Sequence, residues 1–274
     1  MAVEIIGEAG ISHLGSIKVA RQLADHALVA GVGTCKFQTF VPSKLFRQGD
    51  PAAPELEQYA LSYSDFKILA KHCEDIGIEF MSTPGDVDSL KFLIEECGVQ
   101  RIKIGSDDLT YKPLVNAAFA TRKPVLLSTG MATLAEIVDA IPTDNDWFDE
   151  DKIDLTLMHC TSLYPCPPDK VNLRAIRTLQ AYGYPVGFSD HTFLFTAACL
   201  AVALGATVIE KHFCPNNGYE GPDKEVSLSP IELKAFVKAI KVHEILLGDG
   251  IKQPCEQELK NAKDWRKGID GLRG

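Results

Sequence analysis

Eight short apolar runs alternate along the chain with eight longer segments of helical periodicity. The runs are rich in Val, Ile, Leu and Phe, as β-strands are, and comprise Val3–Gly7, Thr34–Gln38, Glu79–Ser82, Arg101–Gly105, Val125–Ser128, Leu155–Cys160, Val186–Phe188 and Thr207–Lys211. The helical segments are Ile17–Ala30, Ser64–Ile76, Val87–Cys97, Pro113–Ala120, Leu134–Ile141, Asn172–Ala181, Phe195–Leu204 and Pro230–Leu247. Apolar strands that alternate with helices are typical of a parallel sheet covered by helices.

Eight strand–helix repeats in about 250 residues match the count of an α/β fold, the (β/α)8 or TIM barrel. The length of 274 residues would also allow two domains. A doubly wound sheet usually has a Gly-rich turn after its first strand, and the segment Gly7–Ser12 lacks that GxGxxG spacing. We therefore expect a barrel domain over residues 1–250 and a C-terminal tail over residues 251–274. Three longer connections would be loops of this domain, at Phe40–Ser62, Asp144–Lys152 and Cys214–Ser229.

Charge and composition limit the partners. The chain has 37 acidic and 28 basic residues and a net charge of −9, which argues against nucleic acid or an anionic membrane surface as the main partner. No apolar run reaches the roughly 18 residues of a membrane span, and the first residues lack a basic leader, so we expect no signal peptide. The eight cysteines are scattered without CxxC pairs and are interpreted as buried free thiols of a cytoplasmic protein.

Barrel enzymes carry their catalytic groups where the strands end. Ionisable or hydroxyl groups lie at the ends of all eight predicted strands, in chain order Glu8; Lys36 and Gln38; Ser82 and Thr83; Lys103, Ser106, Asp107 and Asp108; Ser128 and Thr129; His159 and Ser162; Ser189, Asp190 and His191; and Glu210, Lys211 and His212. A single polar residue at a strand end is ordinary, because loops begin there. Eight strands that all end this way predict a site at one end of the barrel.

Residue spacing places some of these side chains on one face. Lys36 and Gln38, like Glu210 and His212, are two residues apart and point to the same side of an extended strand. Lys36 could instead lie against a helix with its amine in water, and Lys103 has the same ambiguity. If both lysines enter the barrel, they create a cationic pocket for an anion such as phosphate. The hydroxyl groups that would join them belong to Ser106, Ser128 and Ser189.

Two histidines, His191 and His212, close the seventh and eighth strands, which are neighbours in a closed barrel. Neutral imidazoles on adjacent strand ends can share a divalent metal and leave positions open for water and substrate. The alternative is that each histidine is a hydrogen-bonded structural residue. The nearby carboxylates of Asp190 and Glu210 make the metal site an equal hypothesis.

Eight ordered motifs resemble those of the sialic acid synthase family, the phosphoenolpyruvate-dependent nonulosonate synthases. The resemblance runs from Glu4 to about Asp249. It is carried by the segments Ile6–His13, Val32–Phe40, Lys103–Leu109, Leu127–Met131, His159–Pro165, Gly187–Thr192, Ile209–Phe213 and Gly221–Asp223. The resemblance implies a condensation of phosphoenolpyruvate with the aldehyde of an N-acetylated hexosamine, typically N-acetylmannosamine. The products would be a nine-carbon 3-deoxy-2-keto acid and phosphate.

The resemblance also assigns roles to residues. His191 and His212 would ligate a divalent cation, Mn²⁺ foremost and Mg²⁺ or Co²⁺ as alternatives, which polarises the aldehyde oxygen. The substrate-binding set is predicted to be Gln38, Thr83, Lys103, Ser106, Ser128, Ser162, Tyr164, Ser189 and Asp223. The catalytic set is predicted to be Glu8, Lys36 and Asp108. Ser162 stands where relatives often have Asn, and Asp108 where they often have Glu.

Glu8 matches the catalytic acid or base of the family. Attack of the enol carbon on the aldehyde leaves cationic character at C2, and water must add there. A carboxylate beside that carbon can stabilise the cation and take a proton from the water. Tyr164 and Asp223 match residues that face the sugar, although Asp223 could equally form a Pro-Asp turn.

The sequence departs from the family pattern in two places. Ser12 and Leu14 replace two Asn residues, so no ligand role is assigned to either position. Most members continue after the barrel into a small antifreeze-like domain, which lends an arginine to the sugar site of the partner in a domain-swapped dimer. We expect that domain to begin near Asp264–Ile269, so that this chain, which stops at Gly274, is either a naturally short or a truncated form. The resemblance implies a homodimer.

Two other functions stay open at this point. The chain could be a synthase of another 3-deoxy sugar acid, acting on an aldose that lacks the acetamide or carries a phosphate. It could also be a catalytically silent barrel that binds a partner supplying the missing domain. Retention of the acid, both lysines, the serines and both histidines argues against the silent barrel, because grouping such polar side chains has a desolvation cost.

Overall fold

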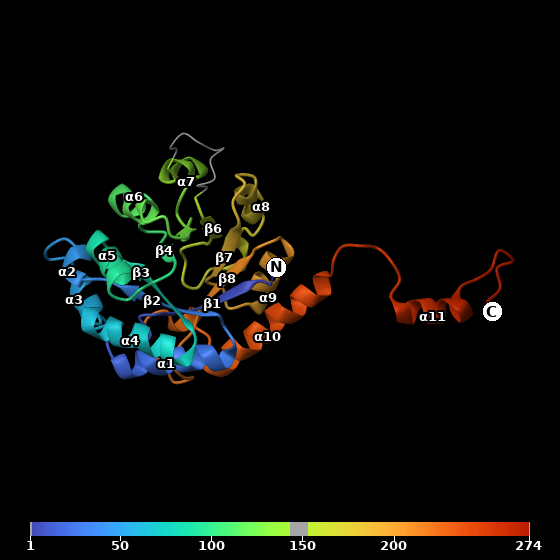
Figure 1. The fold of residues 1–274 in the computed structure, drawn as a ribbon, viewed down its shortest axis with the longest axis horizontal. Coiled ribbons are helices and arrows are strands. Elements are labelled where there is room, and N and C mark those ends of the chain that lie inside the picture. Colours follow the sequence, from blue (N-terminus) through green and yellow to red (C-terminus); the bar gives the residue numbers. More distant parts are fainter. Residues whose placement is uncertain (1, 143–152, 274) are drawn as a thin grey trace. The chain divides into compact units, whose positions relative to one another are not determined.

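The predicted strands form one parallel sheet that curves into a nearly closed barrel (Figure 1). The computed structural model describes residues 2–142 and 153–273. Its strands are β1 Glu4–Gly10, β2 Thr34–Thr39, β3 Glu79–Pro84, β4 Ile102–Ile104, β5 Val125–Ser128, β6 Leu155–His159, β7 Val186–Asp190 and β8 Val208–His212. They are ordered β3-β2-β1-β8-β7-β6-β5-β4, and β3 also contacts β4. The prediction of a (β/α)8 barrel is confirmed.

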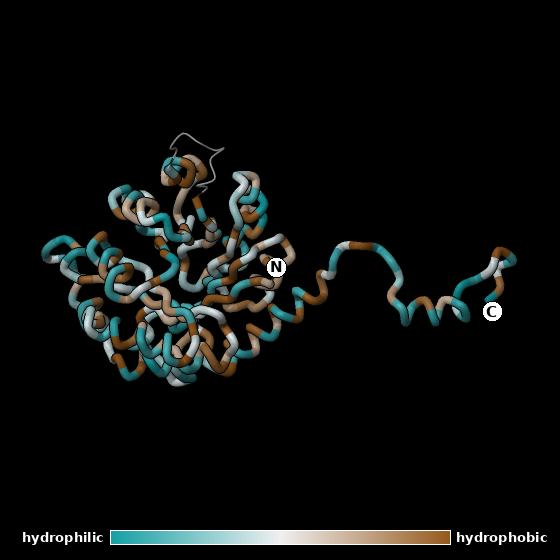
Figure 2. The backbone as a smooth tube through the Cα atoms, viewed as in Figure 1, coloured by the Kyte–Doolittle hydropathy of each residue, from teal (hydrophilic) through white to brown (hydrophobic). Residues whose placement is uncertain are grey.

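Helices surround the strands, and local sequence signals set their ends (Figure 1). The helices are α1 Ile17–Ala30, α2 Pro42–Leu45, α3 Ala53–Glu57, α4 Tyr63–Ile76, α5 Val87–Glu95, α6 Lys112–Ala120, α7 Leu134–Ala140, α8 Ala175–Gln180, α9 Phe195–Ala203, α10 Pro230–Leu247 and α11 Glu256–Trp265, with 3₁₀ turns at Pro168–Lys170 and Lys224–Val226. Ser16 caps α1 by accepting from the Val19 N–H, and Gly31 ends that helix at φ 86°. Apolar and polar residues alternate along the longer helices of the barrel, as Figure 2 shows, and the buried residues of helices such as α1, α4 and α5 form part of the core.

Some elements differ from the sequence prediction. Helices α2 and α3 lie in the segment Phe40–Ser62, which was expected to be a loop. Helix α8 begins three residues later than predicted, because Asn172 has a left-handed backbone at φ 48°. Helix α11 was not predicted, and its N-terminus is closed by a capping box between Cys255 and Glu258. The predicted loop Asp144–Lys152 lies outside the described residues.

The chain divides into two compact units, Met1–Glu244 and Ile245–Gly274. The first unit holds all eight strands and the helices from α1 to α9. The division falls inside α10, and α11 belongs to the second unit. The assignment of residues 1–250 to a barrel domain and of residues 251–274 to a tail stays a prediction.

The apolar core has two parts. The larger lies between the sheet and the helices. A smaller cluster fills the inside of the barrel, and it comprises Ile6, Met81, Leu126, Met158 and Val208. Gly187 makes room for it, since a Cβ there would lie 2.3 Å from the Met158 sulfur. The interior below the strand ends is therefore packed with side chains and is not a channel.

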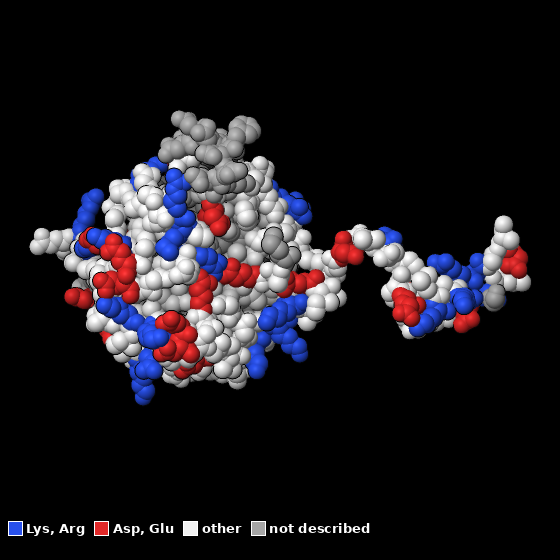
Figure 3. Space-filling model, in the orientation of Figure 1, with Lys and Arg blue, Asp and Glu red and all other residues white. Residues whose placement is uncertain are grey.

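An ion-pair network holds the amino-terminal ends of four strands together. The Arg101 guanidinium, just before β4, lies 2.5 Å from carboxylate oxygens of both Glu4 on β1 and Glu79 on β3. It also donates to the Thr34 hydroxyl on β2 at 3.0 Å. Basic and acidic side chains likewise meet near the centre of the barrel face shown in Figure 3. Because β3 and β4 are not paired by a ladder, this network bridges the one break in the sheet.

All eight cysteines are free thiols, as predicted. The expectation that they are buried holds for six of them and is wrong for two, since Cys97 is half-buried and Cys255 is exposed. Cys255 is exposed because it stands at the start of α11, outside the barrel core. Among the residues that the structure describes, none of the helices has the length and apolar character that a membrane span requires.

We predict that Arg101→Met destabilises the barrel by about 2–3 kcal/mol, because it leaves two carboxylates facing each other without a cation. Loss of one partner from a fully buried ion pair costs about 3–5 kcal/mol, and Arg101 is 20% exposed. Urea unfolding followed by circular dichroism measures the change. The matched control is Arg21→Met on the exposed face of α1, which should change stability by less than about 0.5 kcal/mol. Equal stability of the two variants would contradict the role of the network.

Candidate active site

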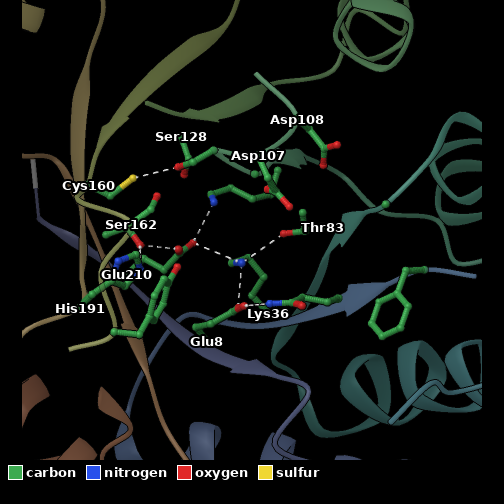
Figure 4. Close-up of a pocket in the computed structure, with 18 of the residues that line it drawn as sticks. Glu8, Lys36, Thr83, Asp107, Asp108, Ser128, Cys160, Ser162, His191 and Glu210 are labelled. Carbon is green, nitrogen blue, oxygen red and sulfur yellow. Dashed lines mark hydrogen bonds and ion pairs between the residues drawn. The ribbon is translucent and has the colours of Figure 1, made fainter. Parts of the chain in front are cut away.

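A cavity of about 590 Å³ opens at the carboxyl ends of the strands, here called the barrel mouth (Figure 4). It is lined by all but one of the residues predicted from the sequence to form the site, namely Glu8, Lys36, Gln38, Thr83, Lys103, Ser106, Asp108, Ser128, Ser162, Tyr164, Ser189, His191 and His212. The exception is Asp223, which lies beside His212. The structure thus brings the predicted residues together, while their individual roles stay predictions.

Four charged side chains form a buried cluster at the floor of the cavity. The Lys36 Nζ lies 2.8 Å from Glu8 Oε2 and 3.5 Å from Glu210 Oε2. The Lys103 Nζ lies 3.6 Å from the same Glu210 oxygen. None of the four side chains is more than 4% exposed. Both lysines therefore point into the barrel, and the alternative in which they lie against helices is excluded.

Sheet register explains why these residues meet. Glu8 on β1 is the partner of Lys36 on β2 and of His212 on β8, and Glu210 on β8 is the partner of Ser189 on β7. Paired residues of a parallel sheet point to the same side, so all of these side chains face inward. Figure 4 shows Glu8, Lys36 and Glu210 converging from separate strands.

The cluster shifts the pKa values of its members in opposite directions. Burial raises the pKa of Glu8 to about 7, against the influence of Lys36. For Glu210, burial acts in the same direction, but Lys103 and Lys36 together outweigh it and hold its pKa below the usual range. Glu8 is therefore the carboxyl that gains or loses a proton near neutral pH, while Glu210 stays ionised.

The pKa values of the two lysines are also shifted in opposite directions. Burial lowers the pKa of Lys103 more than the neighbouring Glu210 raises it. Burial also opposes the charge on Lys36, but Glu210 and Glu8 outweigh it, so its pKa is raised. Lys36 is thus a fixed cation held by two carboxylates, and it also donates to the Thr83 hydroxyl at 3.2 Å.

A recess lined by small groups lies beside the lysines. The backbone N–H of Gly130 donates to Ser106 Oγ at 3.0 Å, and that oxygen lies 3.1 Å from Cys160 Sγ. A Cβ at residue 130 would lie 2.4 Å from the Ser162 hydroxyl oxygen and 2.7 Å from that of Ser106. Glycine is therefore needed for the backbone to approach these hydroxyls. Hydroxyl donors next to buried lysines are well suited to bind a phosphate, and the Gly130 N–H orients one of these hydroxyls.

The two histidines lie together on the other side of the cluster. Their ring centroids are 5.5 Å apart, and Tyr164 stacks on His191 at 4.1 Å. The His191 Nδ1 lies 2.8 Å from the Thr161 carbonyl oxygen and donates to it. Burial lowers the pKa of His191 to about 4 and that of His212 well below its usual value. Both rings are therefore neutral at pH 7, as metal ligation requires.

These contacts fit a metal held by two imidazoles. Because His191 carries its proton on Nδ1, its Nε2 bears a lone pair, and a backbone carbonyl fixes that tautomer. The Nε2 lies 3.2 Å from Ser189 Oγ, whose hydroxyl donates to Glu210. The His212 Nδ1 is buried without a hydrogen-bond partner and lies 3.6 Å from a carboxylate oxygen of Asp223. No group of three or more His, Cys, Asp or Glu side chains that could hold a metal occurs among residues 2–142 and 153–273. Remaining ligands would have to come from water and substrate.

Asp223 lies in a turn and also faces the site, so both alternatives that the sequence left open describe part of its structure. It has a left-handed backbone at φ 57° and precedes a 3₁₀ turn, as a turn residue does. Its side chain nevertheless faces His212, and burial raises its pKa. The turn conformation thus directs the carboxylate toward the site.

The outer half of the cavity differs in character from its floor. An apolar wall is formed by Phe40, Leu45, Phe46, Leu56 and Met131, which come from the segment after β2 and from the loop after β5. Asp107 and Asp108 line the same cavity and are labelled in Figure 4. Burial and the neighbouring Asp107 raise the pKa of Asp108 to about 7. This part of the cavity favours an uncharged ligand with apolar substituents over an anionic one.

Sequence reasoning missed several residues of the site. Glu210 was noted at a strand end but was not assigned to the site, although its position two residues before His212 carried the signal. Gly130 and Cys160 follow strand ends and were overlooked because neither residue has an ionisable group that stands out. The apolar wall could not be found from the pattern, since α2 and α3 were expected to be loop.

The fold and the site together define a barrel protein with a polar ligand pocket at the strand ends. The sequence matches the model of the NeuB family over residues 23–252. The chain belongs to the NeuB family, and the family resemblance inferred from the motifs is confirmed.

Similar proteins include synthases of several sugar acids. The N,N'-diacetyllegionaminic acid synthase of Legionella pneumophila is 38% identical over 94% of this chain and 77% of its own length. The N-acetylneuraminate-9-phosphate synthase of Drosophila melanogaster is 32% identical over 87% of this chain and 67% of its own. Among solved structures, the N-acetylneuraminic acid synthetase of Leptospira borgpetersenii, in complex with citrate, is 33% identical over 98% of this chain and 94% of its own, with a TM-score of 0.87.

We predict that Gly130→Ala weakens binding of phosphoenolpyruvate at least tenfold, which corresponds to about 1.4 kcal/mol. The added methyl group forces the Ser106 and Ser162 hydroxyls out of the recess without disturbing the core. Isothermal titration calorimetry measures the affinity. Gly33→Ala is the matched control, because a Cβ there meets nothing within 4 Å. Unchanged affinity in Gly130→Ala would contradict the assignment of the recess to phosphate.

Proposed function

We propose that this protein condenses phosphoenolpyruvate with the open-chain aldehyde of an N-acetylated hexosamine, N-acetylmannosamine or a related sugar. The products are a nine-carbon 3-deoxy-2-keto sugar acid and inorganic phosphate, so the enzyme is a carbon–carbon bond-forming transferase. The observation that carries the proposal is the buried cluster of Glu8, Lys36, Lys103 and Glu210 next to the hydroxyl-lined recess. Membership of the NeuB family and the names of the relatives support it.

Phosphoenolpyruvate binds at the floor of the cavity. Its phosphate and carboxylate carry negative charge, and Lys36 and Lys103, which both lie near Glu210 Oε2, supply the complementary charge. The donors around the phosphate are the hydroxyls of Ser106, Ser128, Ser162 and Ser189. The Gly130 N–H donates to Ser106 Oγ and so leaves the proton of that hydroxyl available to the ligand. Gln38 and Thr83 complete this part of the pocket, since one donates to Glu8 and the other accepts from Lys36.

Glu8 handles the proton of the attacking water. When C3 of phosphoenolpyruvate bonds to the aldehyde carbon, positive character develops at C2, and the ionised Glu8 stabilises it. Water then adds to C2 and gives a proton to Glu8, whose pKa of about 7 suits this exchange. The tetrahedral intermediate then breaks its bond from C2 to the phosphate oxygen. Phosphate leaves with the bonding electrons and takes the proton of the C2 hydroxyl, so that C2 becomes a ketone. The proton held by Glu8 passes to the alkoxide formed from the aldehyde oxygen. Gln38 keeps Glu8 in place through a hydrogen bond of 3.3 Å.

His191 and His212 would hold the divalent cation, most favourably Mn²⁺, with Mg²⁺ or Co²⁺ as alternatives. When bound, that cation polarises the aldehyde oxygen and so makes the carbonyl carbon more electrophilic. The chain itself orients the pair: the Thr161 carbonyl fixes the ring of His191, and Asp223 faces His212. Tyr164 covers both rings and limits water access to them.

The acceptor sugar occupies the outer half of the cavity. The apolar wall suits the methyl groups of acetamido substituents, and the carboxyl of Asp108 accepts or donates a hydrogen bond to sugar hydroxyls. Asp107 and Asp108 would repel a phosphorylated aldose. An uncharged, acylated aldose is therefore favoured over the phosphorylated acceptor of the alternative function. A cytoplasmic location and a homodimer stay predictions from the sequence.

We predict phosphate release from phosphoenolpyruvate only when an aldose and a divalent cation are both present. N-Acetylated hexosamines should be used at least tenfold more efficiently than their 6-phosphates, because of the carboxylates in the outer half. A phosphate-release assay with a panel of aldoses, combined with mass spectrometry of the products, tests this. Full activity after thorough chelation would contradict the metal role. The absence of phosphate release with every aldose of the panel would contradict the proposed function.

We also predict that Glu8→Gln lowers kcat by about 10²–10⁴-fold, the usual contribution of a general base. The Glu8 carboxyl must be ionised to accept a proton, and burial raises its pKa to about 7. The wild-type rate should therefore fall as the pH drops through about 7, and this limb should be absent from the residual activity of the variant. Glu95→Gln on the exposed side of α5 is the control. Wild-type turnover in Glu8→Gln would contradict the role of Glu8.

A further inference from the structure

Lys211 is a buried lysine that the proposed chemistry does not use. It lies on β8 between Glu210 and His212 and is 1% exposed. Because successive residues of a strand point to opposite faces, it points away from the pocket that its two neighbours line. An ammonium group in such a place needs hydrogen-bond acceptors for its three protons.

The acceptors of Lys211 lie on both sides of His191. Its Nζ donates to the carbonyl oxygen of Asp190 at 3.2 Å and to that of Thr192. The Asp190 carboxylate lies 3.5 Å away and neutralises the charge. The same carboxylate accepts from the Thr192 N–H at 2.8 Å. Lys211 thus fixes the carbonyl groups of the two residues next to His191, and the Asp190 carboxylate fixes the N–H of the peptide that joins His191 to Thr192.

The remaining polar groups of His191 are fixed as well. Its carbonyl oxygen accepts from the Cys166 N–H at 2.8 Å, and its Nδ1 donates to the Thr161 carbonyl. Both partners belong to the loop after β6, whereas Lys211 belongs to β8. His191, which directly follows β7, is therefore held from the β6 side by the loop after that strand, and Lys211 adds side-chain contacts from β8 to the ladder that pairs β7 with β8.

We propose that Lys211 is a positioning residue that fixes the backbone around His191 and so aims Nε2 at the divalent cation. The inference rests on the proposed function, in which His191 and His212 hold that cation. It assigns complementary tasks to three consecutive residues of β8. Glu210 and His212 face the ligands, and Lys211 aligns the second imidazole from behind the sheet. A bare apolar side chain of similar size would fill the same space without fixing the carbonyls.

The test measures Mn²⁺ binding by electron paramagnetic resonance in Lys211→Met. This variant keeps the length of the side chain and removes its donors. Loss of a group that orients a metal ligand typically weakens metal binding about 10–100-fold, and we expect a loss in this range. The affinity for phosphoenolpyruvate, measured by calorimetry, should change less than about twofold, because its donors lie on other residues. Lys238→Met, on the exposed side of α10, is the matched control.

Two further variants keep the proposal testable if Lys211→Met does not fold. Lys211→Arg retains a cation with several donors and should keep Mn²⁺ binding within about tenfold of wild type. Asp190→Asn retains the acceptor for the Thr192 N–H but removes the charge beside Lys211, and it should weaken Mn²⁺ binding by about 3–10-fold. Circular dichroism establishes which variants are folded.

Four results would overturn the inference. If Lys211→Met is folded and its Mn²⁺ affinity is unchanged, Lys211 does not position His191. If Lys211→Met is unfolded, unchanged Mn²⁺ affinity in Asp190→Asn leads to the same conclusion. Equal losses of Mn²⁺ and phosphoenolpyruvate affinity would show a general structural role. Wild-type protein that binds no Mn²⁺ would overturn this inference together with the metal part of the proposed function. If the wild-type protein binds Mn²⁺ and releases phosphate from phosphoenolpyruvate, and Lys211→Met binds Mn²⁺ equally well, this inference alone is overturned.

Discussion

The mutual neutralisation of Glu8, Lys36, Lys103 and Glu210 is the interaction on which the site depends. Each of these four side chains is buried. Without a partner of opposite charge, a buried lysine would lose its proton and a buried carboxylate would gain one. Two cations and two anions within ion-pair distance keep the cluster electrically balanced in the free protein. The balance leaves Glu8 titrating near neutral pH and Glu210 ionised. A ligand with negative charge can then replace contacts to the carboxylates with contacts to the same lysines.

The barrel supports this cluster from below. Arg101 ties the amino-terminal ends of β1, β2 and β3 to the start of β4, across the gap where β3 and β4 are not paired. The apolar cluster inside the barrel fills the space between that network and the site. Strand register is thereby fixed at both ends, so the inward-facing residues of separate strands meet in the order that the site needs. The outer half of the cavity depends less on the strands, because its apolar wall comes largely from the segment after β2.

The alternation of strands and helices was enough to predict the barrel, because eight apolar runs at this spacing have few other solutions. It also predicted that Lys36, Lys103, His191 and His212 would lie at strand ends, since a strand period of two fixes which residues share a face. It could not decide whether Lys36 points inward, because that depends on register with Glu8 and Glu210 on neighbouring strands. Helices α2 and α3 escaped prediction because each is only about one turn long, too short for periodicity to show. The recess at Gly130 depends on side chains that follow β4 and β6 and on the backbone that follows β5, which no local pattern reveals.

A crystal structure with phosphoenolpyruvate and Mn²⁺ tests the central claim most directly, namely that the buried cluster and its recess form the phosphoenolpyruvate site. We expect the phosphate against the Ser106 and Ser162 hydroxyls, with C2 beside Glu8 and both lysines in contact with the ligand. Mn²⁺ should lie between His191 and His212. Phosphoenolpyruvate bound outside the barrel mouth, with the contacts of Lys36 to Glu8 and Glu210 unchanged, would contradict the account.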